Sequence, residues 1–254
     1  MLRSFTDQER VWALADLSRK LGLARPTTLR LLGALEREGM VQRSIPATSY
    51  RLGPRAIQLG ALAQRSNELP IAAHAQLEDL ARRTGETASL EVLTDHEIMV
   101  LAEVRGRFRG SASERVGARW PAHAAATGKV LLAAALKEDG ETWERFVANA
   151  RRLPRYTEHT ITTLSRFRAA LAQVTRDDYA VAVEELERGY VGIGAPVRDY
   201  DGRVVAALCL GGPATRLSTA RLPALIRRVR EAAKRVSQQL GNPDSGHAAR
   251  AERR

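Results

Sequence analysis

Cysteine is nearly absent from this chain of 254 residues, and its single copy, Cys209, excludes an intrachain disulfide bond. The sequence also lacks any run of about 18 apolar residues, so we expect no transmembrane helix and no membrane partner. No secretory signal pattern is visible at the N-terminus. These absences fit a reducing cytoplasm. Aromatic residues make up only 5% of the chain and form no stripe suited to stacking on single-stranded nucleic acid.

Patterns for binding a metal ion or a nucleotide phosphate are also missing. His123, His159 and Cys209 do not have the close spacing of zinc ligands, so we expect neither a metal ion nor a cofactor. The segment 126–129, ATGK, is not a phosphate-binding loop. It lacks the first glycine of that motif, and Val130 rather than Ser or Thr follows the lysine.

No catalytic constellation can be assigned from the sequence. Glu184 and Glu185 are adjacent and should point apart, which favours a solvated or structural role such as tying a strand to a helix. Cys209 lies in an apolar segment and should be an inert core thiol. We therefore expect no enzyme, although a catalytic body using His123 or Cys209 remains an alternative to test by turnover.

Positive charge is what the chain has in excess. The net charge is +11, and the excess lies at the two ends. Residues 1–66 contain 11 Lys and Arg against 5 Asp and Glu, and residues 216–254 contain 10 against 3. A basic N-terminal part on a nearly neutral middle indicates that the N-terminal part meets an anionic partner such as nucleic acid.

Residues 12–53 have the pattern of a winged helix-turn-helix. Leu14, Leu17 and Leu21 predict one helix face, and Gly22 predicts the turn that ends it. Pro26 fits the first turn of a second helix, for which Leu29, Leu32 and Leu35 would form the buried face. Residues 41–43 and 50–52 then predict two short strands joined by a Pro-containing turn.

The second helix of such a unit enters the DNA major groove with its N-terminal end first. The polar residues at that end are expected to contact bases or phosphates, and they are Arg25, Thr27, Thr28 and Arg30. Arg43 and Arg51 are expected to contact the DNA backbone from the wing. The alternative interpretation is a small helical pair without a partner, with each arginine simply solvated.

Residues 1–11 are too short for the helix that normally precedes the pair. We expect this first helix to be truncated because the true start lies upstream. The alternative is a variant whose N-terminal part is loosely folded.

The rest of the chain predicts an α+β body. Residues 54–66 predict a linker helix, and a further helix should run from Pro70 to Gly85. The later helices are expected at 123–136, 143–149, 166–177 and 219–240. The strands are expected at 87–94, 98–104, 179–183, 190–197 and 204–210, with a poorer one at 108–116. An antiparallel sheet with helices before, within and after it should result.

Several separated segments together resemble an IclR-type bacterial transcriptional regulator. They are LADLSRKLGLARPTTLRLLGALEREGMV and YRLG near the N-terminus, HAAATGK at 123–129, YTEHTIT at 156–162 and EELERGYVGIGAPVRDYDGRVVAALCLGGP at 184–213. The resemblance implies a winged helix-turn-helix over 1–53, a linker helix over 54–68 and a GAF-like effector domain over 69–240. It also implies a homodimer, or a dimer of dimers, that binds double-stranded promoter DNA and responds to a small molecule. Residues 241–254 have no core-forming residue beyond Ala and are expected to be a disordered basic tail.

The start of the helix near residues 124–127 offers free backbone N–H groups, for which a carboxylate is the natural ligand. The resemblance places the effector there and implies contacts from Ala126, Thr127, Gly192, Cys209 and Gly211. Arg109 and Ala112, before this helix, are further candidates for the wall of the pocket.

The sequence departs from the family pattern at the pocket. Thr127 stands where the family usually has Ala, and Ala125 where it has Thr. Ala182 replaces an acidic residue, and Cys209 and Gly211 fall where serine is common. We therefore expect a more apolar pocket or a different ligand, such as an aromatic or aliphatic acid. The alternative function is a small-molecule binding protein whose truncated N-terminal part binds DNA poorly.

Overall fold

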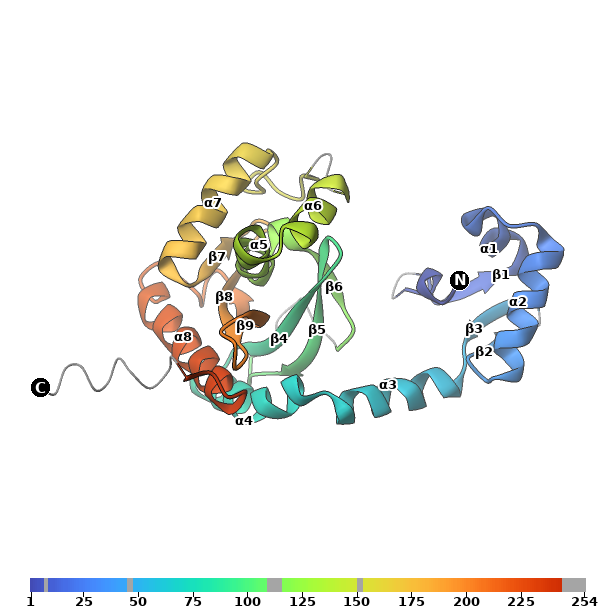
Figure 1. Cartoon of the computed structure of the whole chain (residues 1–254), viewed down its shortest axis with the longest axis horizontal. Coiled ribbons are helices and arrows are strands. Elements are labelled where there is room, and N and C mark those ends of the chain that lie inside the picture. The colour runs from blue at the N-terminus through green and yellow to red at the C-terminus, as the bar shows by residue number, and fades with distance from the viewer. Residues whose placement is uncertain (7–8, 45–47, 109–115, 150–152, 244–254) are drawn as a thin grey trace, which may run out of the picture. The chain divides into compact units, whose positions relative to one another are not determined.

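The computed structural model describes residues 1–6, 9–44, 48–108, 116–149 and 153–243 (Figure 1). The chain divides into two compact units, Met1–Asn67 and a second that begins at Glu68. The prediction of a mixed α+β protein with an N-terminal helix-turn-helix is confirmed.

The N-terminal unit contains the expected helix pair and wing. α1 (Leu14–Leu21) ends at Gly22, whose φ of 65° places it in the left-handed region that glycine adopts without strain. α2 (Arg25–Arg37) has its proline in the first turn, where the missing N–H costs nothing. β2 (Val41–Ser44) and β3 (Ser49–Leu52) form the wing.

A third strand, β1 (Val11–Ala13), corrects the prediction for the start of the unit. It pairs antiparallel with β3, so that Trp12 lies opposite Tyr50. The Trp12 indole also donates to the carbonyl of Ser4, the last residue of the short 3-10 helix η1 (Leu2–Ser4), at 2.8 Å. Sequence periodicity missed this strand because only pairing with the distant β3 stabilises its three residues.

α3 (Pro54–Ser66) follows the wing, as predicted, and none of its side chains is buried. Ile57, Leu59 and Leu62 are all exposed. In the described ranges, no helix has both the length and the apolar content needed to cross a bilayer.

The C-terminal unit is built on one antiparallel sheet of six strands in the order β6-β5-β4-β9-β8-β7. The strands are β4 (Thr87–Thr94), β5 (Glu97–Val104), β6 (Arg119–Pro121), β7 (Ala180–Val183), β8 (Tyr190–Arg198) and β9 (Val204–Pro213). Side chains alternate between the two faces of each strand, so each strand contributes to two cores.

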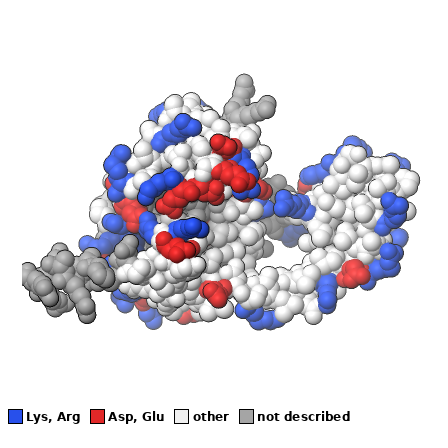
Figure 2. All heavy atoms as spheres, in the orientation of Figure 1, with Lys and Arg blue, Asp and Glu red and all other residues white. Residues whose placement is uncertain are grey.

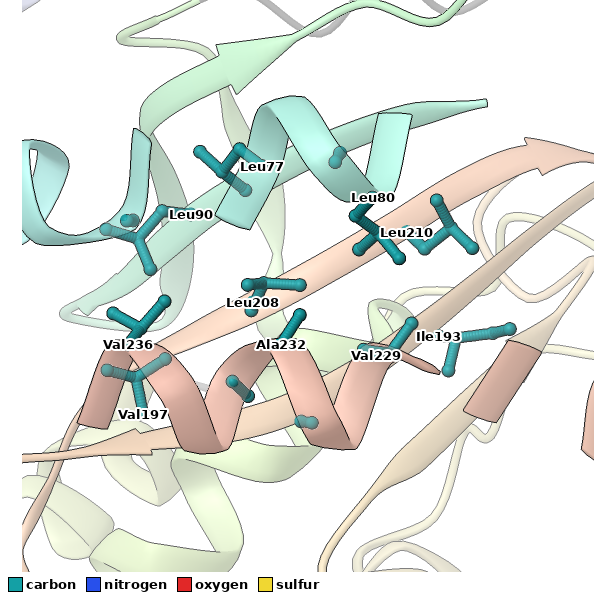
Figure 3. Close-up of a cluster of buried hydrophobic side chains, with 14 of the residues drawn as sticks. Leu77, Leu80, Leu90, Ile193, Val197, Leu208, Leu210, Val229, Ala232 and Val236 are labelled. Atoms are coloured by element: carbon teal, nitrogen blue, oxygen red, sulfur yellow. The ribbon is translucent and has the colours of Figure 1, made fainter. Parts of the chain in front are cut away.

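One face of this sheet packs against α4 (Glu68–Thr84) and α8 (Leu222–Gln239). Figure 3 shows leucines of α4 and β9 meeting the apolar side of α8 at Val229, Ala232 and Val236. The other face packs against α5 (Ala126–Glu138), and α6 (Gly140–Asn149) and α7 (Leu164–Asp177) pack in turn against α5 (Figure 1). The short 3-10 helix η2 (Ala122–Ala124) leads into α5.

Three local predictions need correction. The helix expected from His123 begins at Ala126, after η2. Phe108 and Val116 are not in a strand, and 109–115 lie outside the described residues, whereas β6 was not predicted. The tail expected to be disordered begins with ordered residues, because the Asn242 side chain donates to the Asp199 carbonyl at 2.7 Å. Residues 244–254 lie outside the described ranges.

Candidate DNA interface and effector cavity

The N-terminal end of α2 presents part of the expected basic surface. Arg25 and Arg30 are exposed, Thr27 is half-buried, and neither arginine forms an ion pair with any described residue. The N-terminal unit shows more basic than acidic side chains on its visible face (Figure 2). These guanidinium groups are therefore available to an anionic partner.

The burial of Thr28 shows that α2 turns a different face to the core from the one predicted. Its side chain is fully buried and its hydroxyl donates to the Ala24 carbonyl at 3.2 Å, so it cannot reach a base. Thr28, Leu32 and Leu35 are four and three residues apart and share the inner face, whereas Leu29 is 45% exposed. The spacing of the leucines alone had assigned Leu29 to the core.

The wing carries the two other predicted contacts. Arg43 is exposed, lies over the Tyr50 ring at 5.7 Å and pairs with Glu36 at 3.4 Å. Arg51 is exposed on β3 opposite Gln42. Both side chains end at the surface of the N-terminal unit, where a DNA backbone could be reached, and the contact itself stays a prediction.

A cavity of about 260 Å³ lies between the sheet and the start of α5. We call it the α5 cavity. Its apolar wall consists of small or aliphatic residues, which are Ala124, Ala125, Ala126, Ala182, Leu186 and Gly192. Its polar wall consists of Glu91, Trp120, Thr127, Glu185, Glu187, Tyr190 and Cys209.

Glycines on β8 allow α5 to start close to the sheet. A Cβ at Gly194 would lie 2.9 Å from the Thr127 nitrogen, and one at Gly192 would lie 3.7 Å from the Ala126 Cβ. Gly211 has a different role from the predicted one. A Cβ at Gly211 would lie 2.0 Å from the Tyr190 hydroxyl, so the missing side chain leaves room for the Tyr190 ring. Tyr190, and not Gly211, lines the cavity.

The predicted effector residues are thus partly brought together. Ala126, Thr127, Gly192 and Cys209 all line the α5 cavity. Arg109 and Ala112 lie outside the described residues. His123, the middle residue of η2, does not line the cavity; it is buried, and its Nε2 lies 2.9 Å from the Pro154 carbonyl oxygen. Burial lowers the pKa of His123.

Glu91 is the first residue that sequence reasoning missed. It is buried on β4, where the Ser89 hydroxyl donates to it at 2.7 Å and the Thr127 hydroxyl donates to its other oxygen. The Cys209 thiol also bonds to this carboxyl. Burial raises the pKa of Glu91, and its hydrogen bonds only partly oppose that effect. A glutamate inside an apolar strand was the available signal.

Glu185 and Lys129 form a buried ion pair across the cavity wall. Lys129 Nζ donates to Glu185 Oε1 and also to the Val181 carbonyl at 3.3 Å. Burial raises the pKa of Glu185, while the neighbouring ammonium lowers it. The pair ties the segment after β7 to α5, which agrees with a structural role and excludes the solvated one. Glu184 instead accepts from the Gly189 nitrogen at 2.9 Å.

Two residues that line the cavity each have one buried polar atom without a hydrogen-bond partner among the described residues. The atoms are Glu185 Oε2, a hydrogen-bond acceptor, and Trp120 Nε1, a donor. No group of three or more His, Cys, Asp and Glu able to hold a metal ion occurs in the described part of the chain. The lining of the α5 cavity, small apolar residues with a few polar side chains, is typical of a site for a small organic molecule.

Comparison with known families gives two matches that together span nearly the whole chain. Residues 62–238 match the bacterial transcriptional regulator IclR C-terminal family, and residues 1–44 match the IclR helix-turn-helix domain. The chain is 30% identical to the transcriptional regulator XynR of Escherichia coli, over 96% of this chain and 95% of that protein. It is 33% identical to the glycerol operon regulatory protein of Streptomyces griseus, over 95% and 93%.

Solved structures agree with this assignment. A transcriptional regulator from Rhodococcus sp. RHA1 has a TM-score of 0.77 at 31% identity, covering 94% of both chains. An IclR homologue from Microbacterium hydrocarbonoxydans, complexed with 4-hydroxybenzoate, has a TM-score of 0.77 at 30% identity, covering 94% of this chain and 95% of that one. The relatives are regulators and not enzymes. The chain belongs to the IclR family of DNA-binding transcriptional regulators.

Proposed function

We propose that this regulator binds a palindromic operator through the N-terminal end of α2. The observation that carries the proposal is the exposed pair Arg25 and Arg30 at the start of a helix that a helix-turn-helix places in the major groove. Thr27 lies beside them, and Arg43 and Arg51 would hold the DNA backbone from the wing. Operator binding would place the protein in the cytoplasm.

The operator-bound form is proposed to be a homodimer or a dimer of dimers. α3 has no buried residue, and its apolar side chains Ile57, Leu59 and Leu62 are exposed. An isolated helix of this length is only marginally stable in water. A second copy of the chain that covers α3 would remove this apolar area from water, and a palindromic operator would match the twofold symmetry.

The effector is proposed to be a small organic acid in the α5 cavity. The amides of Ala126 and Thr127 open the helix, where the dipole favours an anion. Burial raises the pKa of the nearby Glu91 carboxyl, which disfavours a second negative charge beside the ligand. The related Microbacterium protein is complexed with an acid of this size, 4-hydroxybenzoate. Two arrangements of α3 would give two different spacings between the N-terminal units of a dimer. The ligand would favour the arrangement that it binds more tightly.

The test is fluorescence anisotropy with DNA from upstream of the gene. We expect specific binding that weakens steeply with salt, because each phosphate contact releases counterions. Arg30→Ala should lower operator affinity by about tenfold to a hundredfold, while Arg166→Ala, an exposed arginine of α7, should not. Unchanged binding by Arg30→Ala would overturn the proposed orientation of α2.

The same assay separates the alternative function. A chain extended to an upstream start codon is compared with residues 1–254. Specific binding by the short chain shows that its N-terminal unit is competent. Ligand binding in the α5 cavity without operator binding by either chain would instead indicate a small-molecule binding protein.

A further inference from the structure

We propose that the outer face of α8 is a second DNA-binding surface, which holds the phosphate backbone of double-stranded DNA without reading its sequence. This contact belongs to the C-terminal unit and is separate from the proposed operator contact of α2. We call it the α8 surface. It consists of the exposed cations of that helix, which are Arg227, Arg228, Arg230, Lys234 and Arg235.

The α8 surface contains most of a charge excess that α2 and the wing leave unexplained. Residues 216–243 contain seven Lys and Arg and a single acidic residue, Glu231. Two of the seven already have protein partners, because Arg216 pairs with Glu86 at 2.6 Å and Arg221 donates to the Arg216 carbonyl at 2.8 Å. The other five cations all lie on α8.

None of these five cations forms an ion pair with a carboxylate among the described residues. Several exposed arginines elsewhere on the C-terminal unit do, as Arg188 does with Glu158 at 2.8 Å. Arg230 lies over the Tyr179 ring at 5.9 Å, which leaves its charge uncompensated. Like charges three and four residues apart on a helix repel one another, so an anion held against α8 would relieve this repulsion.

Helical spacing sorts the five cations into two rows. Arg227, Arg230 and Lys234 follow one another at intervals of three and four residues, and Arg228 and Arg235 are seven residues apart. The opposite side of α8 is the apolar side that packs against the sheet (Figure 3). At about 1.5 Å per residue, the two rows together cover about 12 Å of the helix axis.

The first row lines a groove of about 590 Å³ between α8 and β8. The groove exists because β7 pairs only with residues 191–194 of β8, and no described strand covers the rest of that edge. Asp178 and Arg198 also line the groove, but they pair with each other at 2.5 Å. Glu231 is therefore the one acidic residue of the lining without an ion pair, against three such cations.

Double-stranded DNA fits this surface better than a protein or a small anion does. No large apolar residue of α8 is exposed in the described structure, whereas a protein interface usually needs aromatic or apolar anchors. Protein–DNA interfaces are instead polar and strongly positive. One small anion could not reach both rows, but duplex DNA carries about one negative charge per 1.7 Å of its axis.

The experiment measures, by fluorescence anisotropy, binding of the full chain to two duplexes of equal length. One carries DNA from upstream of the gene, and the other has a random sequence. The test variant combines Arg227→Gln, Arg230→Gln and Lys234→Gln, which removes three charges and keeps good helix formers. It should bind both duplexes at least about tenfold more weakly at low salt, and the slope of log K against log salt should fall by up to about 3.

Two further variants control for net charge and for folding. The matched control combines Arg166→Gln, Arg168→Gln and Arg176→Gln, which removes three exposed arginines from α7. It should change both affinities far less, because salt screens charges that do not touch the DNA. Glu231→Gln removes the single acidic residue between the two rows and should tighten binding to both duplexes, a gain that misfolding cannot produce.

Equal losses in the α8 and α7 variants would overturn the α8 surface, because net charge alone would then explain them. A loss confined to the upstream duplex, or failure of the parent chain to bind the random duplex at low salt, would also overturn it.

Unchanged DNA binding by the α8 variant, together with lost regulation of a reporter gene, would overturn the DNA contact and assign the surface to an acidic protein. Arg30→Ala should weaken binding to the upstream duplex more than to the random one. Absence of that difference counts against the proposed role of α2 alone, so the two proposals fail independently.

Discussion

The two units of this regulator expose their functional atoms in opposite ways. Among its described residues, the N-terminal unit has a small core of five buried apolar residues, and its arginines lie at the surface. The C-terminal unit hides its polar site between a sheet and α5 and surrounds it with two larger cores. A surface site can lose a side chain at little cost in stability, whereas a buried polar site couples ligand binding to folding.

The largest effect should come from breaking the buried ion pair. Lys129→Met leaves Glu185 buried without a cation, which typically costs about 3–5 kcal/mol. Lys137→Met on the same helix removes a lysine whose side chain is 68% exposed, and it should change stability by less than about 0.5 kcal/mol. Urea denaturation followed by circular dichroism measures both. Similar values for the two variants would contradict the account of Lys129.

The next largest effect on stability is expected from a pair of leucine substitutions in α2, one at a buried and one at an exposed position. Leu32→Ala empties a fully buried position and should destabilise the N-terminal unit by about 3 kcal/mol. Leu29→Ala, at a half-exposed position, should cost less than about 1 kcal/mol. Operator binding should be lost in the first variant, while ligand affinity of the α5 cavity should be unchanged. Loss of ligand binding would show that the two units do not fold independently.

The third prediction concerns Thr127 at the N-terminal end of α5. Thr127→Leu puts a bulky side chain into the cavity and removes the hydroxyl that bonds to Glu91. It should weaken effector binding by more than about tenfold, equivalent to about 1.4 kcal/mol, and spare operator binding. Thr127→Ser keeps the hydroxyl and is the control. An unchanged ligand isotherm for Thr127→Leu would mean that the effector binds elsewhere.

The smallest effect is a pH dependence that comes from Glu91. Burial raises the pKa of Glu91 in the folded state. Between the unfolded and the folded pKa, the folded protein therefore keeps this proton while the unfolded chain has lost it. Stability is therefore full below the unfolded pKa and falls as pH rises through the folded pKa. Glu91→Gln does not titrate, so its melting temperature relative to the parent should rise with pH. A difference that is constant with pH would contradict a raised pKa.

Much of the fold follows from local pattern. The turn at Gly22, the proline that opens α2 and the alternating strands were predictable, because backbone conformation and hydrophobic period depend on neighbours in sequence. The site was predictable only in part. Ala126, Thr127, Gly192 and Cys209 do line one cavity, whereas Glu91, Trp120 and Glu185 were not assigned to it.

The sequence by itself determined the two-part organisation, the helix pair with its wing and the basic N-terminal surface, since these depend on composition and short-range periodicity. Tertiary structure alone decided three other features. β1 exists because β3 pairs with it, and Thr28 is buried because the inner face of α2 turns toward the small core. Trp120, on one edge strand, and Glu185, which follows the other, line the same cavity across a separation in sequence that no local pattern encodes.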